Sequence, residues 1–361
     1  MKTVTIIGAG VMGSAMALPF SDRGYDVRLV GTHLDSEIIA SIKTKHFHPK
    51  LNVTLPANVQ AYAHGELAAA LGSDTDLILL GVSSAGISWA LDQLIQFMKR
   101  PTPIVMITKG MHAEQNSLVT LPDVVSNSLK EKFGSSIKIA AIAGPCIAGE
   151  LAVRRQTGTI IVSHDQNFAR QLCKDLETDY YHPRPSIDMI GVETCAAFKN
   201  FFAIAVGWAN GYLEQIPTAE NKAKNNNAAA IIFDQAVHEL ISLTKVLGGQ
   251  IESVWGMAGV GDLYVTCQAG RNSKLGTNLG RGLTYSQVRE GPMKGDTIEG
   301  ADLGRAAAHA IKAMIADGTL TKRSIPLTLS LLSALSTETS LDMPWKDFHQ
   351  TNQLNVMIKA F

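Results

Sequence analysis

A glycine-rich segment near the amino terminus has the spacing of a dinucleotide-binding turn. Residues 6–13 read IIGAGVMG, which places Gly8, Gly10 and Gly13 in a G-x-G-x-x-G pattern. In such a turn the glycines allow a tight bend, close approach of the backbone to a pyrophosphate, and close packing of the next helix. The free N–H groups at the start of that helix then bind phosphate. The alternative is a glycine-rich turn in an unrelated α/β domain.

The end of the next apolar segment bears on which dinucleotide is bound. An acid at this position would accept hydrogen bonds from the ribose 2′-hydroxyl, but residues 30–33 read VGTH. The nearest candidate, Asp35, lies beyond the expected position. Without an acid a 2′-phosphate is not repelled, and Thr32 and His33 can donate hydrogen bonds to it. We therefore expect NADP or NAD as the cofactor, with NADP slightly favoured.

Two lysines stand among apolar residues. Lys109 follows the apolar segment 104–108, so we expect it at the carboxyl end of a strand, where ligands bind in open α/β sheets. The alternative is an ordinary surface lysine. Lys199 lies between CAAF and NFFAI in a segment whose helix would be apolar nearly all round. Its ammonium therefore needs a buried partner, which a functional site or a structural ion pair would provide.

Other polar residues gather in short motifs between apolar stretches: Thr108-Lys109-Gly110, GPCIAGE at residues 144–150, Phe198-Lys199-Asn200, GVGD at residues 259–262, and Arg271-Asn272. Taken singly, each has an unremarkable interpretation. Asp262 beside glycines is typical of a turn, and Arg271-Asn272 is compatible with a solvated loop.

The chain resembles the NAD(P)-dependent glycerol-3-phosphate dehydrogenase family, as a divergent member. Its motifs follow one another over nearly the full length as G-x-G-x-x-G, T-K-G, G-P-x-x-A-x-E, G-V-E with K-N, A-G-x-G-D-L, T-C and R-N. This ordered set is far more specific than any single motif. The resemblance implies reversible hydride transfer between NAD(P)H and the carbonyl of a small phosphorylated ketone, with dihydroxyacetone phosphate and glycerol 3-phosphate as first candidates.

The resemblance also implies roles for individual residues. A lysine in a partly desolvated site can exchange a proton with a carbonyl oxygen, which would make Lys199 the acid/base, supported by Lys109 and Asp262. The substrate positions are Lys109, Gly144, Cys146, Asn200, Asp262, Thr266, Gly270, Arg271 and Asn272, with Arg271 and Asn272 on the phosphate. The cofactor positions are Gly8, Gly10, Val11, Met12, Gly13, Thr32, His33, Lys109, Ala148, Arg271 and Glu299. No metal is expected.

Departures from the family pattern affect the substrate. Cys146 replaces the usual hydroxyl residue, and no paired base supports it as a nucleophile. Gly270 stands where serine is common, and residues 227–236 read NAAAIIFDQA in place of basic and Thr-Arg-Gly positions. The alternatives are therefore a dehydrogenase of another phosphorylated polyol, a dehydrogenase of a hydroxy acid, or a catalytically silent dinucleotide-binding sensor.

Composition excludes several classes of protein. The chain has 361 residues, 46% of them hydrophobic, and its 32 basic residues balance 32 acidic ones, so nucleic acid is a poor partner. Four scattered cysteines without C-x-x-C spacing argue against a disulfide framework and fit a reducing cytoplasm. Glycines interrupt the only signal-like run, and stable membrane insertion is not expected. A homodimer is one assembly that the sequence leaves open.

Hydrophobic patterning predicts an α/β fold in which an amino-terminal Rossmann domain with a doubly wound sheet precedes an all-α domain. The expected strands are 3–7, 27–30, 77–82, 104–108, 139–143 and 159–163, and the expected intervening helices include 11–23, 87–99 and 117–132. Helices are expected again at 192–213, 228–247, 301–317 and 327–336, with a loop at 217–227. We place the cofactor domain at residues 1–190 and the substrate domain at 191–361.

Overall fold

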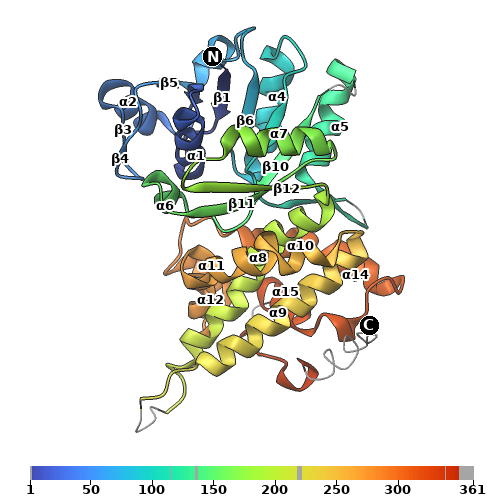
Figure 1. Ribbon diagram of the computed structural model, residues 1–361. Helices are drawn as coiled ribbons and strands as arrows, with labels where there is room; N and C mark the ends of the chain where they lie inside the picture. Colours follow the sequence, from blue (N-terminus) through green and yellow to red (C-terminus); the bar gives the residue numbers. More distant parts are fainter. Residues whose placement is uncertain (1, 115, 135–136, 218–221, 338, 349–361) are drawn as a thin grey trace. The chain divides into compact units, whose positions relative to one another are not determined.

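A computed structural model of the chain describes residues 2–114, 116–134, 137–217, 222–337 and 339–348, whose elements form two units (Figure 1). The first unit holds the described residues up to Lys109 together with Thr120–Met189. The second holds Gly110–Val119 and the described residues from Ile190 onward. The sequence-based boundary left Gly110–Val119 in the first domain. Strand β8 in this segment contacts helix α14 of the second unit, which explains the difference.

One sheet forms the centre of the first unit. Within the described residues it has eight strands in the order β12-β11-β10-β7-β6-β1-β2-β5, all neighbours being parallel except β10 and β11. In chain order these are β1 Thr3–Ile7, β2 Asp26–Val30, β5 Val59–Tyr62, β6 Leu77–Leu80, β7 Ile104–Met106, β10 Ile139–Ala143, β11 Thr157–Val162 and β12 Tyr181–Ser186. The central strands are buried along their whole length, as their continuous apolar runs predict.

Helices and two short strand pairs complete this part of the chain. The helices are α1 Val11–Asp22, α2 Ser36–Lys45, α3 Leu67–Ala70, α4 Ile87–Phe97, α5 Leu121–Phe133, α6 Ala148–Ala152 and α7 Gln166–Leu176. The short strands are β3 Phe47–His48 with β4 Val53–Thr54, and β8 Met111–Ala113 with β9 Leu118–Thr120. The Rossmann-like fold class is confirmed.

One predicted helix begins in the wrong place. Residues 117–132 were expected to be helical throughout, but Leu118–Thr120 is strand β9 and helix α5 begins at Leu121. The Thr120 side chain accepts a hydrogen bond from the Asp123 N–H, and Pro122 occupies the first turn. Both features are typical of a helix start, so the boundary was present in the sequence.

The two edge strands of the large sheet were not expected. β5 is a short strand at one edge of the sheet, and β12 at the other edge contains Pro183 and Pro185. Proline cannot donate a ladder hydrogen bond, so it is tolerated in an edge strand and argues against a central one. Because of these prolines, apolar runs in the sequence did not predict β12.

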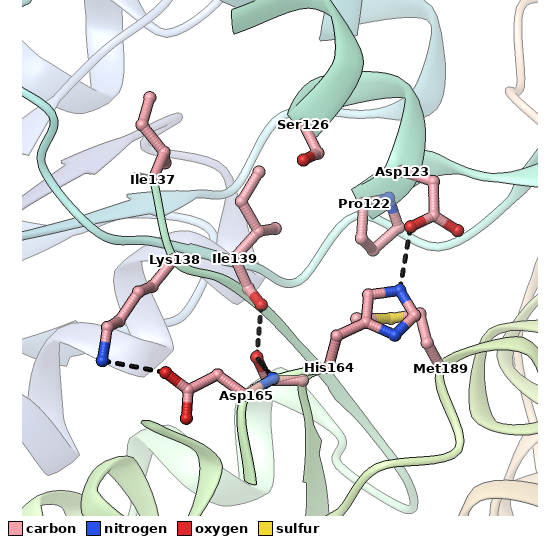
Figure 2. Close-up of a pocket in the computed structure, with 10 residues that line it drawn as sticks. Pro122, Asp123, Ser126, Ile137, Lys138, Ile139, His164, Asp165 and Met189 are labelled. Atoms are coloured by element: carbon pink, nitrogen blue, oxygen red, sulfur yellow. Dashed lines mark hydrogen bonds and ion pairs between the residues drawn. The ribbon is translucent and has the colours of Figure 1, made fainter. Parts of the chain in front are cut away.

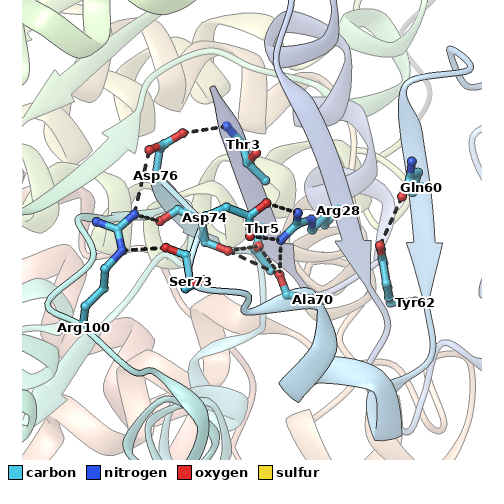
Figure 3. Close-up of polar contacts among 11 residues, drawn as sticks. Thr3, Thr5, Arg28, Gln60, Tyr62, Ala70, Ser73, Asp74, Asp76 and Arg100 are labelled. Carbon is cyan, nitrogen blue, oxygen red and sulfur yellow. Dashed lines mark hydrogen bonds and ion pairs between the residues drawn. The ribbon is translucent and has the colours of Figure 1, made fainter. Parts of the chain in front are cut away.

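Two arginines fix the loop between α3 and β6 (Figure 3). Arg28 on β2 donates to both carboxylate oxygens of Asp74, over 2.9 and 2.5 Å. Arg100 donates to the carbonyl oxygens of Ser73 and Thr75, over 3.1 and 2.5 Å. These bonds tie the loop to its neighbours and engage both guanidinium groups. We therefore assign this cluster to the fold and not to a ligand site.

The second unit is helical, as predicted, and also takes in strand β8. Its helices are α8 Met189–Tyr212, α9 Asn226–Leu247, α10 Ile251–Trp255, α11 Asp262–Gln268, α12 Arg271–Gly280, α13 Tyr285–Glu290, α14 Glu299–Ala316 and α15 Pro326–Ser336. The loop predicted at 217–227 lies in part outside the described residues, at 218–221. Its last two residues, Asn226 and Asn227, already belong to α9, because the helix starts after Asn225.

Glycines bring helices α8 and α12 into backbone contact. A Cβ atom on Gly276 would lie 1.9 Å from the Ile204 carbonyl oxygen, and one on Gly280 would lie 2.2 Å from that of Trp208. On the facing helix, a Cβ on Gly211 would lie 1.9 Å from the Thr277 carbonyl oxygen. Small residues four positions apart allow such close approach of two helices. This contact holds the second half of α12 and the second half of α8 in a fixed relation.

We expect Gly276→Ala to destabilise the second unit. In an isolated helix alanine is more favourable than glycine, but here the added methyl group must separate two packed backbones. Overpacking of this kind typically costs about 1–3 kcal/mol, which thermal unfolding would detect. Gly65→Ala is the matched control, because a Cβ there meets no atom within 4 Å. Equal melting temperatures for both variants would contradict the close approach.

A buried carboxyl caps helix α15. Glu239 of α9 is fully buried, and its two carboxylate oxygens accept hydrogen bonds of 2.6 Å from the N–H groups of Leu327 and Thr328. Gln235 donates a third bond of 2.8 Å. Desolvation is the largest influence on this group, and burial raises the pKa of Glu239 to about 7.

This shifted pKa predicts a pH-dependent stability. Because the folded protein binds the Glu239 proton more tightly than the unfolded chain, stability falls as pH rises from about 4.5 to about 7. We expect the melting temperature of Glu239→Gln, which has no titrating group there, to change less over this range. The melting temperature of wild type, relative to that of the variant, should therefore be highest at the acidic end of this pH range. A difference independent of pH would contradict the assignment.

Helix α8 is long and apolar enough to cross a membrane when length and composition alone are considered. It has 24 residues, its mean hydropathy is 1.4, and it alone meets these criteria among the described helices. However, 83% of its apolar window is buried inside the protein. Burial among the other helices accounts for this composition.

Candidate active site

The glycine-rich turn joins β1, an interior strand of the sheet, to α1. Gly8 has φ +113°, and a Cβ on it would lie 2.7 Å from the Gly81 carbonyl oxygen. A Cβ on Gly13 would lie 2.1 Å from the Gly8 carbonyl oxygen, so this glycine permits the close packing of α1. A Cβ on Gly10, by contrast, meets nothing within 4 Å. The position at which backbone must approach a pyrophosphate therefore faces open space.

The start of α1 fits a phosphate group. Val11 is the first helical residue, and Gly10 before it supplies no side-chain cap. Val11 is 40% exposed, so the first turn is accessible. The N–H groups of an uncapped first turn are the donors that dinucleotide-binding helices offer to phosphate.

Other predicted residues of this unit follow the carboxyl ends of neighbouring strands. Lys109 follows β7, and Gly144 follows β10. Strands β10, β7, β6 and β1 are adjacent and parallel, so the residues that follow them lie at the same end of the strands as Gly8. The Thr108 hydroxyl donates to the Val82 carbonyl oxygen over 2.7 Å and fixes the turn before Lys109.

The segment after β10 contacts the dinucleotide turn. Gly144 has φ +113°, and a Cβ on it would lie 3.2 Å from the Thr159 Cα atom. The Cys146 Sγ atom lies 4.0 Å from the Met12 Sδ atom. A thioether is not a base, so this neighbour does not activate the thiol as a nucleophile. Ala148 begins helix α6, which packs against α1.

The turn after β2 does not aim a carboxylate outward. Asp35 is 8% exposed, and its Oδ2 atom accepts 2.8 Å hydrogen bonds from both the N–H and the hydroxyl of Thr32. The Thr32 hydroxyl proton is therefore engaged by Asp35, in contrast to the expectation that it would bind a 2′-phosphate. His33 is exposed beside it. Among the predicted 2′-phosphate donors, only His33 is left in position to act through its side chain.

In the second unit, Lys199 and Asp262 form a buried ion pair. Their exposed fractions are 4% and 2%. Lys199 comes from the middle of α8, and Asp262 is the first residue of α11, directly after the π-helical turn Met257–Gly261. Such π-turns occur often at functional sites. The structure thus brings together the acid/base candidate and the carboxylate predicted to support it.

Asn272 connects three helices beside this pair. It is 6% exposed, its amide nitrogen donates to Asn200 Oδ1 over 3.1 Å, and its Oδ1 atom accepts from the Gly300 N–H over 3.0 Å. A Cβ on Gly300 would lie 2.3 Å from the Asn200 carbonyl oxygen, so only glycine fits at this approach. Asn200, which follows Lys199 on α8, is therefore held by Asn272 at the start of α12 and packs against Gly300 at the start of α14.

Arg271 and Glu299 also meet, as an ion pair between the first residues of α12 and α14. Their side chains are 50% and 38% exposed, so a ligand can reach them. Gly270 has φ +119° and precedes α12, which explains a glycine at this position. The Thr266 hydroxyl donates to the Asp262 carbonyl oxygen over 2.7 Å, within its own helix.

Burial also affects a cysteine next to this group. Desolvation raises the pKa of the Cys267 thiol to about 12, and the positive charge of Lys199 opposes that shift. At neutral pH the thiol is protonated and is a poor nucleophile.

A cavity of about 380 Å³ in the first unit lies elsewhere (Figure 2). Its lining includes the residues around the start of β10 and the end of β11. Gly8 follows the carboxyl end of β1, so the cavity lies at the opposite end of the strands from Gly8. Its charged groups pair with each other: His164 with Asp123 over 3.0 Å, and Lys138 with Asp165 over 2.8 Å. None of the predicted site residues lines this cavity.

The sequence matches two family models that together span most of the chain. Residues 3–169 match "NAD-dependent glycerol-3-phosphate dehydrogenase N-terminus", and residues 188–342 match "NAD-dependent glycerol-3-phosphate dehydrogenase C-terminus". The chain belongs to the NAD-dependent glycerol-3-phosphate dehydrogenase family. The resemblance inferred from the order of the motifs is thereby confirmed, and the protein is placed among oxidoreductases that use NAD(P).

Relatives in the glycerol-3-phosphate dehydrogenase family align over most of their length. An "NADP(+)-dependent glycerol-3-phosphate dehydrogenase" of Archaeoglobus fulgidus is 35% identical over 290 residues, which cover 80% of this chain and 82% of the relative. A "Glycerol-3-phosphate dehydrogenase [NAD(P)+]" of Corynebacterium aurimucosum is 31% identical, covering 82% of this chain and 87% of the relative.

Solved structures of glycerol-3-phosphate dehydrogenases share the fold. The enzyme of Coxiella burnetii superimposes with a TM-score of 0.77 at 25% identity, covering 98% of this chain and 99% of that one. The enzyme of Saccharomyces cerevisiae gives a TM-score of 0.77 at 21% identity, covering 97% and 99% of the two chains. The second comparison bears on the fold alone.

Some residues that shape the site in this family member were missed from sequence. The inward orientation of Asp35 was not foreseen, and neither was His48, which contacts the glycine-rich turn. A Cβ on Gly31 would lie 2.5 Å from the Ile39 Cγ1 atom and 3.3 Å from the Asp35 Cβ atom, but no local pattern indicated which way the Asp35 carboxylate points. His48 lies in a short strand with no recognisable motif, so no local pattern indicated it.

Proposed function

We propose that this family member catalyses the reversible, NAD(P)H-dependent reduction of dihydroxyacetone phosphate to glycerol 3-phosphate. The observation that carries the proposal is the buried ion pair of Lys199 and Asp262. Burying two charges is unfavourable unless they are paired, and a buried lysine is suited to proton transfer. The similarity to relatives named as glycerol-3-phosphate dehydrogenases supports the same reaction.

The first unit would hold the dinucleotide at its glycine-rich turn. The open space at Gly10 and the uncapped start of α1 fit a pyrophosphate. When bound, NAD(P)H supplies the hydride, and the protein supplies binding and proton transfer. NADP is favoured over NAD because the carboxylate of Asp35 is engaged by Thr32, so no acid from this turn repels a 2′-phosphate.

Lys199 would act as the general acid and base. A carbonyl carbon that accepts a hydride leaves negative charge on its oxygen, and the Lys199 ammonium donates a proton to that oxygen. In the reverse direction the neutral amine accepts the proton from the alcohol. Asp262 orients the ammonium and balances its charge in a buried setting. For Lys109 we propose the supporting role that the family resemblance implies.

The substrate phosphate would bind at the start of α12. Arg271 offers a forked and permanently charged set of donors, and it is half exposed in its pair with Glu299. A primary amide carries two N–H donors, so Asn272 keeps one beyond the bond to Asn200. The helix start adds a favourable positive potential for a dianion.

We expect Arg271→Ala to impair use of the phosphorylated substrate more than that of its unphosphorylated analogue. A charge-assisted hydrogen bond contributes about 1.5–3 kcal/mol, so kcat/KM for the phosphorylated substrate should drop by about 10- to 150-fold. Steady-state kinetics on dihydroxyacetone phosphate and dihydroxyacetone would measure both losses. Equal losses on the two substrates would mean that Arg271 acts on the cofactor or the fold.

A larger phosphorylated polyol is the second candidate substrate, and one observation favours it. A cleft of about 440 Å³ begins at Gly270 and continues along α12 past Lys274, Asn278 and Arg281. A Cβ on Gly270 would meet nothing within 4 Å, so the serine common in the family is replaced here by open space. These polar side chains suit additional hydroxyl groups.

A substrate panel tests the proposal. Oxidation of NADPH and NADH would be followed by absorbance with dihydroxyacetone phosphate, longer phosphorylated ketoses and small keto acids. The proposed function requires the phosphorylated ketones to be turned over and the keto acids to be poor substrates. Preference for a keto acid would identify a hydroxy acid dehydrogenase, and dinucleotide binding without turnover would identify a sensor.

We propose three further assignments, which concern the domains, the location and the assembly of the protein. We propose that residues 1–190 serve the cofactor and 191–361 the substrate, apart from the segment Gly110–Val119 that associates with the second unit. We propose a cytoplasmic location, which the four scattered cysteines without C-x-x-C spacing support. A homodimer is proposed as the assembly, to be measured by analytical ultracentrifugation.

A further inference from the structure

The backbone of Ala9, inside the glycine-rich turn, is held through its N–H group by a carboxylate distant in sequence. Asp35 Oδ2 accepts a hydrogen bond of 3.3 Å from the Ala9 N–H, in addition to its two bonds from Thr32. All three donors converge on one oxygen atom. A single buried oxygen thus links the turn after β1 to the turn after β2.

The carbonyl group of the same residue, which belongs to the next peptide group, is held from the other side. His48 has no exposed surface, and its Nε2 atom lies 3.2 Å from the Ala9 carbonyl oxygen. The Leu51 N–H donates to Nδ1 over 3.0 Å, so Nδ1 is the acceptor and Nε2 carries the proton. The Ser14 hydroxyl donates to the same carbonyl oxygen over 3.1 Å. Burial lowers the pKa of His48, which keeps the ring in this neutral form.

These contacts leave the phosphate-binding donors untouched. They engage Ala9, while the first N–H groups of α1 begin at Val11 and receive no cap from Gly10. A contact that served helix stability alone would cap those N–H groups. The contacts instead fix the orientation of the turn on which the pyrophosphate would rest, and rigid support of this kind improves binding by reducing the ordering needed on association.

We propose that Asp35 and His48 are positioning residues that hold the two peptide groups on either side of Ala9 and thereby preorganise the pyrophosphate turn for the dinucleotide. In this role Asp35 replaces the ribose-binding acid of related folds, since the carboxylate that would meet a 2′-hydroxyl is turned into the protein. The same carboxylate thus supports the turn and leaves the 2′ end free of negative charge. The inference rests on the proposed dinucleotide function but on no particular substrate.

The test compares Asp35→Ala with Asp35→Asn. Asparagine can place its amide oxygen at the Oδ2 position and accept the same three bonds, whereas alanine accepts none. We expect Asp35→Ala to raise the Kd of NADPH and of NADH by about 10-fold or more, and Asp35→Asn to raise them by less than about threefold. Fluorescence titration measures both constants without a substrate. A failure of the proposed reaction therefore leaves this test intact.

A second readout separates positioning from general damage to the fold. At saturating dinucleotide, kcat of each folded variant should stay within about threefold of wild type, because the clamp acts on binding and not on proton transfer. A parallel pair extends the test: His48→Leu should weaken dinucleotide binding, and His48→Gln, which keeps an N–H donor, should weaken it less. The pair is also informative if Asp35→Ala fails to fold.

Two results would overturn the proposal, and one pattern of results would support it. A folded Asp35→Ala or His48→Leu variant with wild-type Kd values for NADPH and NADH would overturn the proposal. Losses in Asp35→Asn equal to those in Asp35→Ala would also overturn it, because they would show that the hydrogen-bond acceptor is not what matters. Rescue by asparagine and glutamine, with kcat preserved, is the pattern that positioning requires.

Discussion

Replacing Lys199 with alanine is expected to lower kcat by about 10²-fold or more, since general acid and base catalysis typically contributes 10² to 10⁴. The lysine ammonium is the only proton source that we assign to the carbonyl oxygen. Its pair with Asp262 is buried, so water is a poor substitute for it. Stopped-flow or steady-state measurement of NADPH oxidation would give the loss directly.

The control must separate proton transfer from the ion pair itself. Lys199→Ala leaves the Asp262 carboxylate buried without its cation, which destabilises proteins by about 3–5 kcal/mol. Lys199→Arg keeps a positive charge beside Asp262, but a guanidinium does not release its proton at neutral pH. We therefore expect the arginine variant to fold, to bind dinucleotide, and still to lose about 10²-fold in kcat.

Two results would refute this role. If Lys199→Arg retained kcat within about threefold of wild type, the ion pair would be structural and another group would donate the proton. If both variants bound NADPH normally and wild type itself turned over no carbonyl substrate, the protein would be a sensor. Thermal unfolding of each variant would show whether a loss of rate reflects a loss of folded protein.

The sequence was sufficient to predict the elements whose signals are local. An apolar run ending in Gly8 and followed by G-x-x-G specifies strand, turn and helix together, and β1 and α1 begin where that pattern places them. The carboxyl-end position of Lys109 followed from the same rule. The ordered motifs then identified the family without any structural information.

Contacts between distant segments were harder to predict because no local pattern encodes them. Glu239 is a polar residue in an apolar helix, and only the structure shows that it caps α15. The partner of Lys199 was chosen from a motif, but the π-helical turn that delivers Asp262 was not foreseen. Gly276 and Gly280 did carry a readable signal, since glycines four residues apart suggest close helix packing.

The difference between local signals and long-range contacts also explains why the turn after β2 was predicted only in part. From sequence, the absence of an acid at residues 30–33 favoured NADP, and Asp35 was simply too far along the chain. The structure shows a different physical situation, in which Asp35 is close in space to the glycine-rich turn but is directed inward. Sequence spacing correctly indicated the lack of an outward carboxylate, but not where the carboxylate goes.

Replacing Gly10 with valine is expected to abolish dinucleotide binding while leaving the protein folded. A Cβ at this position meets no protein atom within 4 Å, so the side chain can be accommodated in the free protein. The space that it fills is the space through which the backbone would approach the pyrophosphate. The variant therefore separates binding from folding more cleanly than substitution of Gly8 or Gly13, which would clash with backbone atoms.

Melting curves with and without NADPH measure this effect. A ligand at 100 times its Kd stabilises the folded state by about 2.7 kcal/mol, which raises the melting temperature of wild type by several degrees. We expect no such rise for Gly10→Val. Gly65→Val is the matched control, because its Cβ also meets open space but lies outside the glycine-rich turn, and it should respond as wild type does. A normal NADPH-induced rise in folded Gly10→Val would move the dinucleotide away from the turn between β1 and α1, and with it the roles assigned to Asp35 and His48.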